Sequence, residues 1–251
     1  MYGKGWRWTM TERDKLALTQ SANRLQIGPS SFDWNGETLK IFFDEISTPH
    51  FNRIKGTVTI KPKNITNIEV PLTKSGSHIW RPFAPSAEIE VDIGRKGWQW
   101  SGHGYFDANF GTRALEQDFS YWTWARLPVS KGSVTFYEAE LRNDSPFKLA
   151  LKFHENGNVE EIKPPPKSKL SRSLWAVKRE TRADKGFTPY QVKHMLDTPF
   201  YTRSAIKTKI FGEETVGVHE ALDLKRFSNP FLMPMLTLRV PRVASKANYK
   251  S

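Results

Sequence analysis

Apolar and polar residues alternate with a period of two along several short stretches of this chain. The alternation is clearest over residues 39–43, 56–60, 88–93, 134–139 and 148–153. Because successive side chains of a β-strand point to opposite faces of a sheet, this period predicts half-buried strands. Turn-forming residues separate the stretches, as at Asn35 and Gly36 and at residues 155–158. Many short strands at such spacing are typical of antiparallel barrels and sandwiches, so we expect an all-β fold.

One stretch carries a helical signal instead. Between Met10 and Leu25, Thr11 stands where a helix N-cap would be, directly ahead of the charged residues 12–14. The same stretch also fits a strand followed by a loop, and the pattern does not decide between the two.

Two breaks in the pattern indicate how the chain is divided. Three successive prolines at residues 164–166 cannot continue a strand ladder, so they form either a linker or a stiff loop between strands. The composition also changes near residues 127–132. We therefore expect one β-rich unit over residues 1–127 and a second over residues 128–251.

The chain is strongly basic. Its 251 residues include 38 Lys and Arg against 26 Asp and Glu, which gives a formal net charge of +12. The basic residues are spread along the chain without a long block, which favours a solvated basic surface over a nucleic-acid-binding patch. Such a surface is also attracted to anionic lipid headgroups. No apolar run approaches the roughly 20 residues that a membrane-spanning helix needs.

Several kinds of chemistry are excluded by missing motifs. The chain has no cysteine, so disulfides, thiolate metal sites and a Cys nucleophile are ruled out. Its six histidines show no pair at metal-ligand spacing. Neither a phosphate-binding Gly loop nor the Gly-x-Ser-x-Gly nucleophile motif is present. The sequence therefore predicts no metal and no cofactor.

One dense segment, residues 98–111, combines aromatic and titratable residues. If this segment is extended, alternation places His103, Tyr105, Asp107 and Asn109 on one face of a strand. Each of these residues taken alone has an ordinary structural explanation. Such a succession on a single face is nevertheless unusual for a core, and it predicts a candidate site.

A second segment repeats the arrangement upstream. In residues 77–80, alternation puts His78 and Trp80 on the same face of a strand, and residues 121–124 add further aromatic side chains downstream. Individual tryptophans are most often packed in a core, so the combination matters more than any one member.

The run over residues 101–111 closely resembles the acyclic carotenoid 1,2-hydratases, also called hydroxyneurosporene synthases, and the Gly-Tyr-x-Asp-Ala-Asn core of the run at residues 104–109 is specific to that family. The resemblance spans nearly the whole chain. It continues through residues 10–13, 27–30, 114–116, 122–124, 174–175, 181–184, 197–203, 219–220 and 239–242.

The resemblance implies both a fold and an activity. The fold is one of two lipocalin-like antiparallel β-barrel or sandwich units. The activity is the cofactor-free addition of water to the terminal C1=C2 bond of an acyclic carotene such as neurosporene or lycopene. Family members carry further strands before the segment that matches residues 2–5, so we expect the first unit to be incomplete and to have an unpaired strand edge.

The resemblance also assigns roles to four residues. Asp107 matches the proton donor, and a carboxyl group in an apolar pocket can stay protonated near neutral pH. Trp80 and Tyr105 match aromatic positions that stabilise the carbocation formed by protonation. His78 matches the base that takes a proton from the attacking water. His103 has no matching role and is expected to support the others from outside the site.

The expected partners are then an acyclic carotenoid and water, with no nucleic acid. Because carotenes partition into membranes, we expect a cytoplasmic protein that contacts the inner, photosynthetic membrane peripherally, with residues 231–238 as a candidate contact. The sequence leaves the oligomeric state and the preferred carotene open. It also leaves open a non-catalytic lipocalin-like carrier, and a terpenoid cyclase-type enzyme on the same scaffold.

Overall fold

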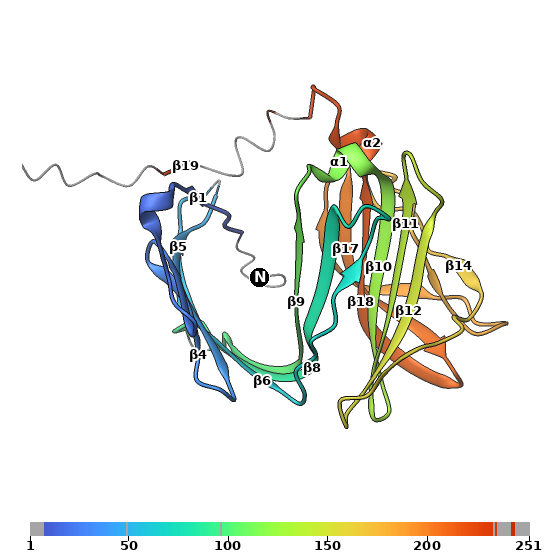
Figure 1. Ribbon diagram of the computed structural model, residues 1–251, viewed down its shortest axis with the longest axis horizontal. Coiled ribbons are helices and arrows are strands. Elements are labelled where there is room, and N and C mark those ends of the chain that lie inside the picture. Colours follow the sequence, from blue (N-terminus) through green and yellow to red (C-terminus); the bar gives the residue numbers. More distant parts are fainter. Residues whose placement is uncertain (1–7, 49, 96, 233, 235–241, 244–251) are drawn as a thin grey trace, which may run out of the picture. The chain divides into compact units, whose positions relative to one another are not determined.

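The computed structural model describes residues 8–48, 50–95, 97–232, 234 and 242–243, and it is built almost entirely of β-strands (Figure 1). Four of the five stretches predicted from alternation lie in strands, and the fifth, residues 88–93, runs one residue past the end of β8 (His78–Asp92); this confirms the all-β prediction. Within the described residues, no helix is long and apolar enough to cross a membrane.

The chain divides into two compact units. Unit 1 comprises residues 1–63, 87–104 and 233–251, and unit 2 comprises residues 64–86 and 105–232. The predicted boundary near residue 127 differs from this division, because residue 127 lies within a strand of unit 2. Two long strands, β8 (His78–Asp92) and β9 (Gln99–Gly111), contribute residues to both units.

Unit 1 is a meander of antiparallel strands in the order β2-β3-β4-β5-β6-β8, with β9 paired to β8. A small core of Ile54, Val91 and Ile93 lies against its partly buried apolar neighbours. The elements of this unit, besides its parts of β8 and β9, are β1 (Glu12–Arg13), the 3-10 turn η1 (Lys15–Ala17), β2 (Leu18–Gln20), β3 (Arg24–Ile27), β4 (Ser30–Trp34), β5 (Leu39–Ile46), β6 (Arg53–Pro62) and β19 (Arg242–Val243).

The helical reading of Met10 to Leu25 is wrong, and the alternative of strand and loop is correct. Only one 3-10 turn forms there, and its N-cap is Asp14, whose side chain accepts a hydrogen bond from the Leu16 backbone N–H. Leu16 is 73% exposed, so no apolar face is buried that could stabilise a longer helix.

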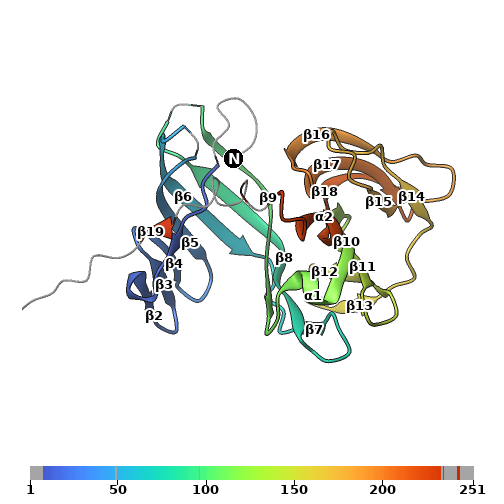
Figure 2. The ribbon, with the colours of Figure 1, turned by 90° about the horizontal axis from the view of Figure 1, so that it is seen from above.

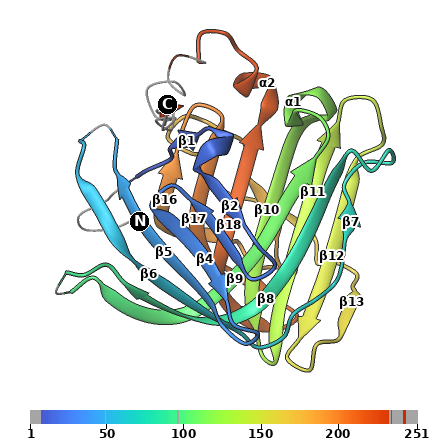
Figure 3. The same ribbon diagram turned by 60° about the vertical axis from the view of Figure 1, so that its left-hand side comes forward.

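Unit 2 is built on a seven-stranded antiparallel sheet in the order β13-β12-β11-β10-β18-β17-β16 (Figures 1 and 3). Two short helices, α1 and α2, lie beside each other at one end of this sheet. Its elements, besides its parts of β8 and β9, are β7 (Val70–Pro71), α1 (Leu115–Asp118), β10 (Phe119–Val129), β11 (Gly132–Leu141), β12 (Phe147–His154), β13 (Val159–Glu161), β14 (Lys167–Lys169), β15 (Glu180–Arg182), β16 (Tyr190–Asp197), β17 (Tyr201–Ile210), β18 (Glu213–Asp223) and α2 (Leu224–Phe227).

One face of the seven-stranded sheet carries the main apolar core, which includes Leu127, Val134 and Ile206. The β14–β15 pair packs on this face (Figure 2): the Thr208 hydroxyl donates to the Arg182 carbonyl at 2.9 Å. The proline run at residues 164–166 is the stiff connection between β13 and β14, which confirms the loop alternative for that segment.

The opposite face of the same sheet is aromatic. Period two along β10 and β11 places Trp122, Trp124 and Tyr137 on this face, away from Leu127 and Val134. The parts of β8 and β9 that belong to unit 2 pack against it, through ring contacts described below. This aromatic face therefore positions the candidate site.

Candidate active site

Asp107 on β9 lies at the centre of the candidate site. Its Oδ2 atom accepts a hydrogen bond from Trp80 Nε1 at 2.7 Å and another from the Tyr105 hydroxyl at 2.8 Å. Tyr105 and Asp107 are two residues apart on β9, so the pleat puts both side chains on the same face. Three of the four predicted site residues thus form one hydrogen-bonded cluster.

Aromatic rings of the seven-stranded sheet surround this cluster. Trp80 is fully buried, and its ring lies 5.7 Å from that of Tyr137 and 6.5 Å from that of Phe153, between centroids. The Tyr105 ring lies 5.1 Å from the Trp124 ring. Both hydrogen-bond donors to Asp107 are therefore held in place by packing.

Burial controls the protonation of the cluster. Loss of hydration raises the pKa of the Asp107 carboxyl, although the hydrogen bonds from Trp80 and Tyr105 and the charge of Arg203 act in the opposite direction. Burial and the neighbouring Asp107 charge raise the pKa of Tyr105 well above its usual value. Tyr105 is therefore a hydrogen-bond donor at any physiological pH, and the acidic form of Asp107 persists to higher pH than that of an exposed Asp.

His78 belongs to a different network at the start of β8. Its Nε2 atom lies 3.0 Å from Asp118 Oδ2, which also accepts a hydrogen bond from the Ser77 hydroxyl at 2.9 Å. Arg113 pairs with the other oxygen of Asp118 at 3.2 Å. On its remaining side, the His78 ring faces Gly111, where an added Cβ would come within 2.6 Å of Nδ1. His78 is thus paired with Asp118 rather than joined to the Asp107 cluster.

Sequence reasoning missed several residues of this region. Asp118, the partner of His78, lies 40 positions away along the chain. Glu220 on β18 and Arg203 on β17 are cross-strand partners on the aromatic face, with Arg203 Nε 3.3 Å from Glu220 Oε1. Burial and the charge of Asp107 raise the pKa of Glu220, against the opposing effect of Arg203. Only strand register brings these residues together, so no local motif could reveal them.

His103, which shares the strand face predicted for Tyr105 and Asp107, is exposed and belongs to unit 1. Among the described residues, no group of three or more His, Asp and Glu side chains could hold a metal ion. The predicted contact segment 231–238 lies largely outside the described residues.

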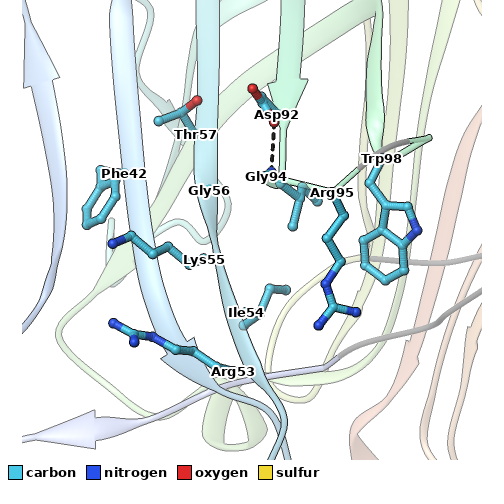
Figure 4. A pocket seen from close by; sticks show the side chains of 11 residues that line it. Phe42, Arg53, Ile54, Lys55, Gly56, Thr57, Asp92, Gly94, Arg95 and Trp98 are labelled. Atoms are coloured by element: carbon cyan, nitrogen blue, oxygen red, sulfur yellow. Dashed lines mark hydrogen bonds between the residues drawn. The ribbon is translucent and has the colours of Figure 1, made fainter.

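Unit 1 contains a separate, open cavity of about 450 Å³ (Figure 4). It is lined by basic and aromatic side chains that already have partners: Arg53 pairs with Asp44 at 2.5 Å, and the Arg95 guanidinium lies 5.6 Å from the centre of the Trp98 ring. None of the four predicted site residues lines this cavity.

Comparisons with known proteins identify the family. The carotenoid hydratase CrtC family matches residues 1–249 of the chain. An acyclic carotenoid 1,2-hydratase from Cereibacter sphaeroides is 52% identical over 242 residues, which cover 96% of this chain and 86% of that protein. Another from Rhodobacter capsulatus is 50% identical over 244 residues, again with 96% and 86% covered.

The fold has its own counterpart among solved structures. A crystal structure assigned to AttH from Nitrosomonas europaea aligns with a TM-score of 0.56 at 10% identity, over 84% of this chain and 73% of that chain. This likeness concerns the fold alone, and it agrees with the lipocalin-like, all-β architecture. The family match over nearly the full length and the two relatives lead to one conclusion: the chain belongs to the carotenoid hydratase CrtC family.

Proposed function

We propose that this protein adds water to the terminal C1=C2 bond of an acyclic carotenoid, as the names of its relatives suggest. The observation that carries the proposal is the partly buried Asp107 carboxyl group, which accepts two hydrogen bonds from packed aromatic side chains. Hydration of an alkene needs an acid that protonates carbon and a water molecule that captures the cation. Both can be supplied without a cofactor.

Asp107 is the proton donor in this proposal. Both of its hydrogen bonds end on the same atom, Oδ2, so that oxygen acts as an acceptor twice and the acidic proton is favoured on Oδ1. Transfer of this proton to C2 leaves a tertiary cation at C1 and a carboxylate at Asp107. The two donors to Oδ2 then stabilise the new negative charge, because hydrogen bonds to an ionised acceptor are the stronger ones.

Trp80 and Tyr105 have a second role in the proposal. Their ring faces can stabilise a nearby cation by about 2 kcal/mol or more where water is excluded. Trp80 is fully buried and Tyr105 is packed against Trp124, so neither ring has to reorganise when the charge forms. The same two side chains thus favour both products of the proton transfer, the carboxylate and the cation.

For His78, the role of base remains a proposal taken from the family resemblance. Its pairing with Asp118 would stabilise the imidazolium that forms when the ring accepts a proton. Asp118 also fixes which ring nitrogen is engaged, so a proton from water would have to reach Nδ1, on the side of Gly111.

The solubility of the substrate determines where the protein must meet it. A carotene is dissolved in the bilayer, so we propose a peripheral contact with an anionic, photosynthetic membrane, supported by the net charge of +12. The remaining functions from the sequence, a carrier and a terpenoid cyclase, use the same pocket and become outcomes of the following test.

The test is chromatography with mass detection after incubation with lycopene or neurosporene in detergent micelles, for the protein as it is and for Asp107→Asn. We expect a product heavier by one water, and a loss of at least about 100-fold in the variant, because general acids contribute at least that much. Asn keeps an oxygen acceptor for Trp80 and Tyr105, so the variant should fold. Carotene binding without any product would indicate a carrier. A product of unchanged mass would indicate a cyclase. Full activity of the Asp107→Asn variant would show that Asp107 is not the acid.

A further inference from the structure

Glu220 is a second, partly buried carboxyl group on the aromatic face of unit 2. Its side chain is 17% exposed and pairs with Arg203 on the neighbouring strand β17. On its other side, Glu220 is the cross-strand partner of Trp124 on β10. A buried carboxyl group is costly unless it serves a structural or chemical purpose, so its position calls for an explanation.

Strand register places Glu220 in one row with the residues that pack against the Asp107 cluster. Across the sheet, Tyr137 on β11 pairs with Trp124 on β10, and Trp124 pairs with Glu220 on β18. The Tyr105 ring, whose hydroxyl donates to Asp107, lies 5.1 Å from the Trp124 ring. Asp107 and Glu220 therefore both lie next to aromatic side chains of the same sheet face.

Electrostatics agree with this placement. The charge of Asp107 contributes to the raised pKa of Glu220, the charge of Arg203 acts on both carboxyls, and both carboxyls raise the pKa of buried Tyr137. Two carboxyl groups that share one low-dielectric pocket do not ionise together easily. Arg203 pairs directly with Glu220, so its charge favours the ionised form of Glu220 over that of Asp107.

A further donor on this face lacks a partner. The indole Nε1 of Trp124 is buried and, among the described residues, makes no hydrogen bond. Buried donors are usually satisfied by protein or by an ordered water. Solvent does not reach this atom in the structure, so the donor would hold a water oxygen on the face that carries Glu220 once the side chains around it move apart.

We propose that Glu220 is the base that takes a proton from the water attacking the C1 cation, an inference that rests on the proposed hydratase function. Asp107 gives its proton to C2, the water oxygen forms the bond to C1, and Glu220 accepts the proton released from that oxygen. The alkene and one water become one tertiary alcohol. Asp107 ends as carboxylate and Glu220 as acid, and return of the proton to Asp107 resets the site.

The decisive variant is Glu220→Gln, assayed with and without sodium azide. Azide is an anion that captures a carbocation without losing a proton, so it needs no base. We expect the alcohol to fall about 100-fold in the variant, in line with the contribution of a general base, while azide yields a carotenoid azide. Asp107→Asn should give neither product, because no cation forms in it.

The matched control is Glu214→Gln, the same substitution on the same strand at an exposed ion pair with Lys207. It should hydrate like the unaltered protein. Folding of each variant is checked by circular dichroism. If Glu220→Gln does not fold, Glu220→Asp and Glu220→Asn form a second pair that differs only in charge, and the Asp variant should be at least about 10-fold more active.

Three results would overturn the assignment. They are undiminished hydration by Glu220→Gln, loss of both alcohol and azide product in the folded variant, or equal activity of the Asp and Asn variants. Failure of the proposed function itself looks different, because the unaltered protein would then give no alcohol at all. A variant with His78→Gln, assayed in the same way, compares the two candidate bases directly.

Discussion

Asp107 has its acidity set by opposing effects that can be separated one side chain at a time. Burial raises its pKa, while the Trp80 and Tyr105 donors and the charge of Arg203 lower it. The net direction is upward, so the acid is present at higher pH than for an exposed Asp. Activity that depends on this proton is lost as the pH rises through the Asp107 pKa, which gives the alkaline limb of the pH–rate profile.

Trp80→Phe and Tyr105→Phe test this balance. Each substitution removes one donor to Oδ2 but keeps an aromatic ring, so the carboxylate form is less stabilised and the pKa of Asp107 rises. We expect the alkaline limb of kcat/KM to move to higher pH in both variants, with kcat reduced about 10-fold as the donors to the product carboxylate are lost. A limb that moves to lower pH would mean that another group controls it.

At the scale of elements, the strands were predictable because each depends on a local pattern of alternation, as at residues 134–139, which lie in β11. The placement of Tyr105 and Asp107 on one strand face was also predictable from the pleat. The family resemblance then added Trp80 to the same site. The stretch from Met10 to Leu25 was ambiguous because its apolar side chains bury no helical face.

The remaining partners depend on register between distant strands. Residues 219 and 220 stood among the motifs of the resemblance, and alternation puts successive strand residues on opposite faces, but nothing local shows which of the two points to the aromatic face. His219 packs on the β14–β15 side, where Nε2 donates to the Glu180 carbonyl at 2.8 Å. Glu220 points to the aromatic face beside Arg203. The pairing of β18 with β10 and β17 decides which residues become neighbours on each face. This register cannot be predicted from a single sequence.

The end of β9 offers a test of the contact with the start of β8. An added Cβ at Gly111 would lie 2.6 Å from His78 Nδ1 and 2.7 Å from the Ser77 carbonyl oxygen, so Gly111→Ala forces the His78 ring or the backbone around it to shift. We expect a loss of about 1–3 kcal/mol of stability, typical of overpacking, while lower hydration activity follows only if His78, and not Glu220, is the base. Thermal unfolding and the hydration assay measure the two effects.

Gly102→Ala is the matched control on the same strand, because nothing lies within 4 Å of its added Cβ. It should change neither quantity. If Gly111→Ala is less stable but hydrates carotene at the full rate, the position of the His78 ring does not matter for the reaction, and the role of base for His78 fails.

At the scale of the whole molecule, the net charge of +12 predicts how the protein meets its substrate. Attraction of a basic surface to anionic lipid is screened within a Debye length of roughly 8 Å at physiological salt. We expect flotation with vesicles that contain phosphatidylglycerol at low salt, and at least about 10-fold weaker binding in 0.5 M salt. Phosphatidylcholine vesicles are the control, and equal, salt-independent binding to both would show that charge plays no part.

The long strands β8 and β9 also constrain how such a protein can change over evolutionary time. Tyr105 is the first residue of unit 2 on β9, and Asp107 follows on the same strand, while the other end of that strand belongs to unit 1. A recombination breakpoint placed between the units would cut the strand that carries the proposed proton donor. Exchange of one whole unit would therefore have to rebuild this strand, whereas substitution within the units leaves it intact.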